Sequence, residues 1–216
     1  MAPRPVPTPI FRLVHLDNLA VCLAEGGLWA PNHIPAAARR WKPIHNVELQ
    51  SKRGDQPVAC GPGGTLHDYV PFYLGPRSPM LLQLHTGRVT GYQEGQDPLI
   101  YVTSTVQRVQ DAGLGFVFSN GHGFARFTEW FDDAARLDTE VDWATVYARQ
   151  WNDTPADPDR QRRKQAEFLV HRVCPWDLVD GFAVVSAAVE GRVTGLLADV
   201  GVGLRRPIAV RKDWYY

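Results

Sequence analysis

Short runs of β-branched and aromatic residues, each ended by glycine, proline or another turn former, recur along the chain, as is typical of strands. We predict strands over 10–15, 68–74, 80–84, 99–102, 115–119, 166–173, 182–189 and 208–211. Helical spacing is weaker and predicts helices over 19–25, with Asp17 as N-cap, 47–53, 106–112, 131–137 and 143–151. Because helices do not alternate regularly with strands, the pattern indicates an α+β domain and disfavours a Rossmann sheet.

The stretch 30–66 is predicted to be mostly irregular. Prolines recur through it, and Gly61-Pro62-Gly63-Gly64 must form a turn. The helix over 47–53 is the one regular element expected there. So long an irregular stretch in a compact domain is usually functional or mobile.

Glu167 is the most informative polar residue, because it begins an apolar strand. Alternation puts Glu167, Leu169 and His171 on one face of that strand. It also follows a basic run made of Arg160, Arg162, Arg163 and Lys164. The residues alone leave two interpretations open. Glu167 is either a strand-end partner of a nearby cation or a carboxylate held in a cleft, with the basic run contacting nucleic-acid phosphates.

Three further places are candidates for chemistry. Arg53 ends the predicted helix in the irregular stretch, although a lone arginine is more often simply solvated. The aromatic-rich segment 66–80 forms either core and turn or the wall of a pocket in which rings stack on a ligand. His122 lies between glycines in a predicted loop and is either a surface residue or a contact to a base or phosphate.

Composition narrows the class of protein. The 216 residues carry 23 basic and 23 acidic side chains, so an anionic partner must be held by a local patch. The three cysteines are scattered, and no apolar stretch is long enough to span a membrane. We expect one domain over 1–216, soluble, cytoplasmic and monomeric. The histidine and cysteine spacings predict no metal site, and the absence of GxSxG disfavours a serine hydrolase.

Ordered motifs spread over the chain carry a family resemblance. They are Pro9-Ile10 with 15–19, Pro62-Gly63-Gly64 with 67–73, 76–80, 164–170 and 211–216. With these motifs in this order, the chain resembles the DarT family of DNA ADP-ribosyltransferase toxins. Where many relatives have His-x-Thr, this chain has Arg12-Leu13-Val14.

The resemblance implies an ADP-ribosyltransferase fold, α+β, with a split, mainly antiparallel sheet core and peripheral helices. It implies NAD⁺ as co-substrate, no metal, and transfer of ADP-ribose to a base, usually thymine, in a short motif of single-stranded DNA. It also implies a macrodomain antitoxin, DarG, that removes the modification.

Carried over by position, the resemblance makes Glu167 the catalytic glutamate and Arg53 the arginine at the acceptor base. The residues expected at NAD⁺ are Arg12, Leu13, Val14, His15, Asn18, Val21, Trp29, Tyr73, Arg77 and Ser78. The residues expected at DNA are His122, Arg126, Arg160, Arg162, Arg163, Lys164 and Gln165.

Three alternative functions stay open. The acceptor of ADP-ribose could be guanine, RNA or protein. The chain could be a catalytically silent nucleic-acid-binding module that keeps the fold, although the presence of both Glu167 and Arg53 disfavours this. It could also be an NAD⁺ glycohydrolase, which would release nicotinamide without DNA.

Overall fold

A computed structural model describes residues 2–35, 41–199 and 206–216. Its main feature is an eight-stranded sheet in the order β10-β9-β4-β1-β3-β7-β5-β6. The strands of this sheet are β1 (Pro9–His15), β3 (Tyr69–Tyr73), β4 (Leu99–Thr105), β5 (Phe116–Ser119), β6 (Trp130–Phe131), β7 (Glu167–His171), β9 (Gly181–Val184) and β10 (Ile208–Val210). Every pairing is antiparallel except that of β9 with β10.

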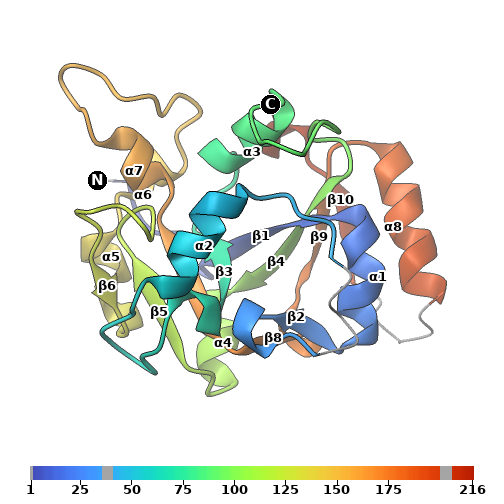
Figure 1. Ribbon diagram of the computed structural model, residues 1–216, viewed down its shortest axis with the longest axis horizontal. Coiled ribbons are helices and arrows are strands. Elements are labelled where there is room, and N and C mark those ends of the chain that lie inside the picture. The colour runs from blue at the N-terminus through green and yellow to red at the C-terminus, as the bar shows by residue number, and fades with distance from the viewer. Residues whose placement is uncertain (1, 36–40, 200–205) are drawn as a thin grey trace.

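Helices surround the sheet (Figure 1). They are α1 (Leu16–Ala24), α2 (Val47–Asp55), α3 (Pro79–His85), α4 (Val106–Asp111), α5 (Leu137–Glu140), α6 (Trp143–Val146), α7 (Arg160–Lys164) and α8 (Ala187–Asp199). A small second sheet pairs β2 (Gly27–Trp29) with β8 (Val173–Pro175). In Figure 1, α1 and α8 lie at one end of the molecule and α5, α6 and α7 at the other, while α2 crosses in front of the sheet.

The alternation predicted for β7 is confirmed by its packing. Phe168 and Val170 lie in the largest apolar cluster, which also contains Ile10 and Val14 of β1. Leu169 points to the other face, into a smaller cluster. Glu167 pairs with Tyr73 across β7 and β3, so these two side chains share that other face.

Several predicted elements are wrong. The run 80–84 belongs to a helix, α3, because Ser78 caps it by accepting a hydrogen bond from Leu81 N and Pro79 fits its first turn. The strand predicted over 182–189 ends at Val184, and α8 begins at Ala187. The predicted helix over 131–137 is replaced by the end of β6 and a 3₁₀ turn.

The helix predicted over 143–151 is limited to α6, Trp143–Val146. The first helix starts earlier than predicted. His15, not Asp17, is the N-cap of α1, and its ring accepts a hydrogen bond from Asp17 N. No helix in the described ranges is long and apolar enough to cross a membrane.

Candidate active site

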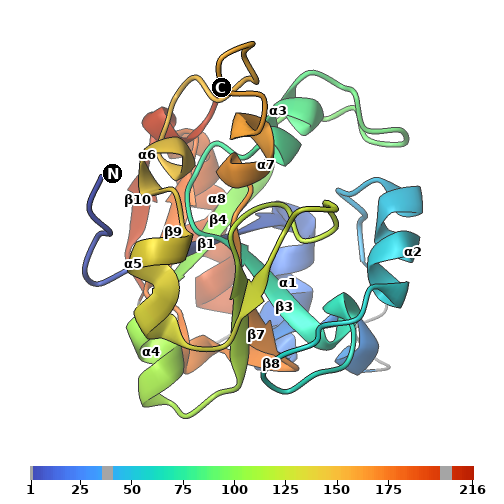
Figure 2. The same ribbon diagram turned by 90° about the vertical axis from the view of Figure 1, so that its left-hand side faces the viewer.

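The sheet is split between β1 and β3. Along its whole length β1 pairs with β4, but it pairs with β3 only at Phe11 and Tyr73. A cavity of about 490 Å³ opens at this split, lined by parts of β1, α1, β2, α2, β3, α3 and β7. In Figure 2 the same α2 stands to one side of β3, away from α4 and α5. The sequence-predicted split core is therefore confirmed, and the split is where a ligand fits.

Arg53 and Glu167 form a buried bidentate ion pair in the wall of this cavity. Arg53 Nη1 donates to Glu167 Oε1 at 3.0 Å, and Nη2 donates to Oε2 at 2.7 Å. The two residues are 7% and 3% exposed. The α2 helix supplies Arg53 and the start of β7 supplies Glu167, so the pair joins segments far apart in sequence. Both oxygens of the carboxylate are occupied before any substrate is present.

The pair keeps both groups charged. Burial by itself raises the pKa of Glu167, but the Arg53 guanidinium outweighs burial and holds this pKa below its ordinary value. Burial likewise opposes the charge of Arg53, yet Glu167 raises the pKa of that guanidinium above its ordinary value. An arginine in this state is a poor proton acceptor and a good stabiliser of negative charge.

The loop after β5 completes the surroundings of Glu167. Gly123 N donates to Glu167 Oε1 at 2.8 Å, and Glu167 N donates to Ser119 Oγ at 3.1 Å. A Cβ atom at Gly123 would lie 3.0 Å from both Glu167 Oε1 and the Trp130 ring, so glycine allows the close approach. Sequence reasoning missed this backbone donor. The glycines on either side of His122 were the signal that could have found it.

Arg12 supplies an unpaired cation to the same cavity. Its Nη1 donates to the Pro71 carbonyl at 2.8 Å across the split, whereas its buried Nε has no partner among the described residues. No carboxylate forms an ion pair with it within those residues, and burial lowers the pKa of its guanidinium. A buried donor without an acceptor is costly unless a ligand satisfies it. Arg12 therefore marks a place for a polar or anionic part of a ligand.

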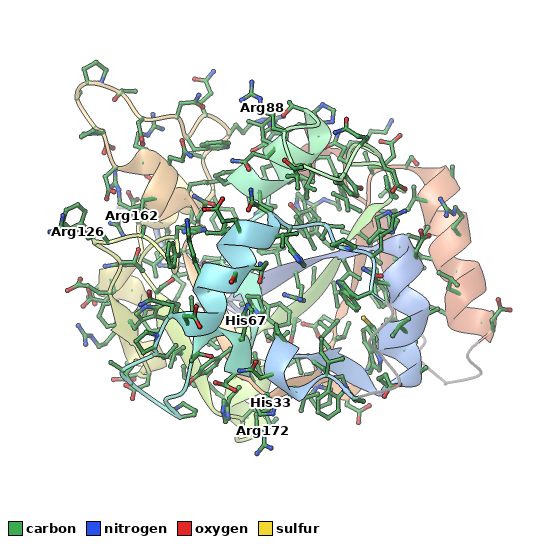
Figure 3. The ribbon with its side chains drawn as sticks, viewed as in Figure 1. His33, His67, Arg88, Arg126, Arg162 and Arg172 are labelled. Atoms are coloured by element: carbon green, nitrogen blue, oxygen red, sulfur yellow. The ribbon has the colours of Figure 1, made fainter. Side chains whose placement is uncertain are left out.

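The cavity gathers many of the predicted site residues. Its lining includes Arg12, Leu13, Val21, Trp29, Arg53, Tyr73, His122, Gln165 and Glu167. The lining also contains residues that were not predicted, among them Trp41, His45, Gln50 and Gln161. His67, labelled in Figure 3 below α2, lines it as well and belongs to the segment that the sequence marked as a possible pocket wall.

Five residues expected at NAD⁺ lie outside this lining and have structural contacts instead. Val14 is buried in the apolar core, and His15 caps α1. The Asn18 side chain bonds both the N and O atoms of Lys42, each at 2.8 Å, and so fixes the segment that brings His45 to the cavity. Arg77 packs over the Tyr216 ring, and Ser78 caps α3.

The basic run forms the short helix α7. Arg162 donates to Asp159 Oδ2 at 2.7 Å and to Asn120 Oδ1 at 3.0 Å. Arg163 pairs with Asp142 and Asp157. These arginines thus tie α7 to its neighbours, which leaves less of their charge for an outside phosphate than the sequence suggested. Figure 3 shows Arg162 and Arg126 on the same side of the molecule.

Lys164, which was expected at DNA, points into the protein in this structure. Its side chain is buried, only 2% exposed, and its Nζ donates to Val146 O at 2.6 Å and to Ala148 O at 3.1 Å. Burial lowers the pKa of Lys164 to about 7. Backbone carbonyls rather than phosphates are its partners, and it holds α7 against the loop after α6.

Comparison with known proteins identifies the family. A family model described as "ssDNA thymidine ADP-ribosyltransferase, DarT" matches residues 11–216. The chain belongs to the DarT family. A similar relative, a DNA ADP-ribosyl transferase of Thermus sp. strain 2.9, is 41% identical over 212 residues, which are 98% of each chain. A DNA ADP-ribosyl transferase of Escherichia coli O127:H6 is 35% identical over 207 residues, 96% of this chain and 93% of that protein.

Solved DarT structures share the fold. Thermus sp. 2.9 DarT in complex with ADP-ribosylated ssDNA matches with a TM-score of 0.93 at 39% identity, covering 100% of this chain and 99% of that chain. The same DarT in complex with NAD⁺ matches with a TM-score of 0.87 at 38% identity, covering 99% of this chain and 100% of that chain. These matches confirm the family and the α+β fold predicted from the sequence.

Proposed function

We propose that this protein transfers ADP-ribose from NAD⁺ to a base, thymine, in single-stranded DNA and releases nicotinamide. The observation that carries the proposal is the buried Arg53–Glu167 pair in the wall of the cavity, in a chain of the DarT family. Solved structures of one relative, Thermus sp. 2.9 DarT, are complexes with NAD⁺ and with ADP-ribosylated ssDNA, which supports both substrates. In cells the protein acts as a toxin that a macrodomain antitoxin counteracts.

The cavity fits NAD⁺. Its volume of about 490 Å³ is in the range of small-molecule and cofactor sites. Trp29 and Tyr73 supply aromatic surface for flat rings, and the Arg12 guanidinium, which lines the cavity, supplies positive charge and donors for the diphosphate or the carboxamide oxygen. This arginine takes the place of the histidine that many relatives have.

Glu167 stabilises the transition state. As the bond between the ribose C1′ and the nicotinamide nitrogen breaks, its electron pair leaves with nicotinamide and positive charge develops on the ribose. A carboxylate hydrogen-bonded to a ribose hydroxyl stabilises this charge more than it stabilises the ground state. Because Glu167 lies on a strand and is held by Gly123 N and Arg53, it is oriented before substrate binds.

Arg53 stabilises the acceptor base. Thymine N3 attacks C1′ and must lose a proton, so negative charge develops on the base. The raised pKa of Arg53 keeps its guanidinium charged, which suits stabilisation of that charge and not removal of the proton. The proton goes instead to Glu167 or to water. The base must be unpaired, because N3 is hidden in a duplex.

The DNA strand enters past the loop 120–129 and α7. The proposed contacts are His122 and Gln165, which line the cavity, Arg126 on the loop 120–129, and Arg160, Arg162 and Arg163 of α7. Lys164 is left out because it is buried.

Neutralising Arg126 and Arg160 together, as glutamines, is expected to weaken the salt dependence of oligonucleotide binding. Each lost phosphate contact should reduce the slope of log K against log salt by about 0.7 for a single strand. Fluorescence anisotropy over a salt series measures the slope. The matched control is Arg88→Gln, since Arg88 lies above α3 in Figure 3, away from Arg126. An unchanged slope in the double variant would remove both residues from the DNA footprint.

The activity is tested directly with NAD⁺ and a panel of short single-stranded oligonucleotides. Mass spectrometry is expected to show addition of one ADP-ribose to a thymine within a preferred sequence, with equimolar nicotinamide released. Parallel reactions contain RNA of the same sequences, thymine-free DNA that keeps guanine, or protein. Label on any of those, or nicotinamide release at full rate without DNA, would replace the proposal with one of the alternatives.

A further inference from the structure

Phe127 is an aromatic side chain that the fold leaves in solvent. It is 75% exposed, more than any other large aromatic residue in the described ranges. Burial of such a ring is a major source of stability, so an exposed one contributes little to folding. The apolar clusters of the core do not include it.

An arginine accompanies the ring. The Arg126 guanidinium carbon lies 5.7 Å from the centroid of Phe127, within range of a weak cation–π contact. Arg126 projects from the edge of the molecule in Figure 3, on the same side as Arg162. In the ranges described, no ion pair or hydrogen bond ties the Arg126 side chain to the protein. An exposed ring with a neighbouring cation is the combination with which proteins bind unpaired nucleobases and their phosphates.

The turn that carries Phe127 is joined to the catalytic carboxylate. Ala125 N donates to His122 O at 2.8 Å, Thr128 Oγ1 donates to the same carbonyl at 2.8 Å, and His122 lines the cavity. The next residue, Gly123, donates to Glu167 at 2.8 Å. Four residues span at most about 14 Å even when extended, and this segment is folded back. Phe127 is therefore fixed within the reach of a nucleotide next to the one in the cavity.

We propose that Phe127 is a stacking platform for the unpaired base that neighbours the acceptor nucleotide, with Arg126 on the adjacent phosphate. The proposal rests on the proposed function, because it assumes that single-stranded DNA is the substrate. Stacking on Phe127 would draw the strand across the loop and leave the acceptor base free to enter the cavity. It makes this loop a determinant of which DNA sequences are modified.

The test compares Phe127→Leu with Phe127→Trp, and with Tyr147→Leu as a matched control at another exposed aromatic residue. Initial rates are measured against oligonucleotide concentration at saturating NAD⁺. Phe127→Leu is expected to raise KM for the oligonucleotide about tenfold with little change in kcat, because stacking accounts for a large share of single-strand affinity. Phe127→Trp should restore KM, whereas the control should match the wild type.

Abasic substitutions locate the stacked base. Removing the base on one side of the acceptor should raise KM about tenfold in the wild type and have no further effect in Phe127→Leu. A wild-type KM in Phe127→Leu would overturn the proposal and leave Phe127 free for a protein partner. An abasic effect that persists fully in Phe127→Leu would also overturn it.

A binding measurement separates this proposal from the proposed function. Oligonucleotides containing 2-aminopurine are titrated with the protein without NAD⁺, and stacking is expected to quench fluorescence in the wild type but not in Phe127→Leu. Quenching without any base modification would refute the proposed reaction and keep the platform. Base modification together with equal quenching in the wild type and in Phe127→Leu would overturn the platform and leave the proposed reaction standing.

Discussion

Replacing Glu167 with glutamine is expected to lower the rate of DNA ADP-ribosylation by roughly a thousandfold, since removal of one preorganised stabilising group costs about 10²–10³ in rate. Glutamine keeps the size of the side chain and an oxygen that can accept from Gly123 N, but it removes the negative charge that faces the developing ribosyl cation. The measurement is the single-turnover rate at saturating NAD⁺ on an oligonucleotide that the wild-type protein modifies. Binding of both substrates should change far less than the rate.

Glu167→Asp is the control that keeps the negative charge but changes its position. It keeps the carboxylate but shortens its reach from β7, so it should lose the second bond to Arg53 and recover only part of the activity. Circular dichroism and thermal unfolding confirm that each variant is folded. A glutamine variant with more than a tenth of the wild-type rate would remove Glu167 from the catalytic role.

Replacing Arg53 with alanine is expected to lower the rate strongly and to give the residual rate a new dependence on pH. Without the guanidinium, Glu167 is a buried carboxyl with no cation, and burial raises its pKa. In the wild type the pKa of Glu167 lies below its ordinary value of 4.5, so the carboxylate persists until the pH falls below that value. In Arg53→Ala the acid limb should move above pH 4.5. Measured pH–rate profiles of the two proteins decide this.

The lowered pKa of Glu167 also makes the free energy of unfolding depend on pH. Because folding lowers the pKa of Glu167 in the wild type, the pair stabilises the fold above the ordinary pKa and ceases to do so as the pH falls through the folded pKa. Leaving a buried charge unpaired costs about 3–5 kcal/mol, so Arg53→Ala should unfold at lower urea concentration. The double variant Arg53→Ala with Glu167→Gln should recover part of the stability that Arg53→Ala loses.

Arg53→Lys distinguishes charge stabilisation from proton removal. Lysine keeps the charge but cannot bind both carboxylate oxygens in one plane, so about a tenfold loss in rate is expected, with a pH profile like that of the wild type. If the pH–rate profile of the wild type instead shows a titration near neutral pH, and Arg53→Lys shifts that titration, Arg53 would be the base.

Because strand alternation is local, the sequence predicts which face of β7 carries Glu167, whereas its catalytic role is an expectation from the family resemblance. It does not predict the partner of that carboxylate, since Arg53 is 114 positions away and reaches Glu167 only through the packing of α2 on the sheet. The helix α3 was missed because a five-residue apolar run suits either a strand or a helix. Its Ser78-Pro79 start was the signal that decides between them.

The basic run shows a different limit. Four cations within five positions predict a contact with phosphates, but charge alone does not say which of them the protein itself uses. Lys164 points inward to two carbonyls, and Arg163 is bound by acidic residues from other elements. Arg12 is the opposite case: it stands on an apolar strand, yet it lines the cavity, and its Nε has no partner within the described residues.

The 114-residue separation between Arg53 and Glu167 also affects how the protein is made. At typical synthesis rates of 5–20 residues per second, a ribosome needs roughly 6–23 s to extend from one to the other. A nascent chain therefore cannot form the Arg53–Glu167 ion pair until β7 has been made. A chain that ends before position 167 lacks Glu167, so we expect fragments from interrupted translation to leave DNA unmodified.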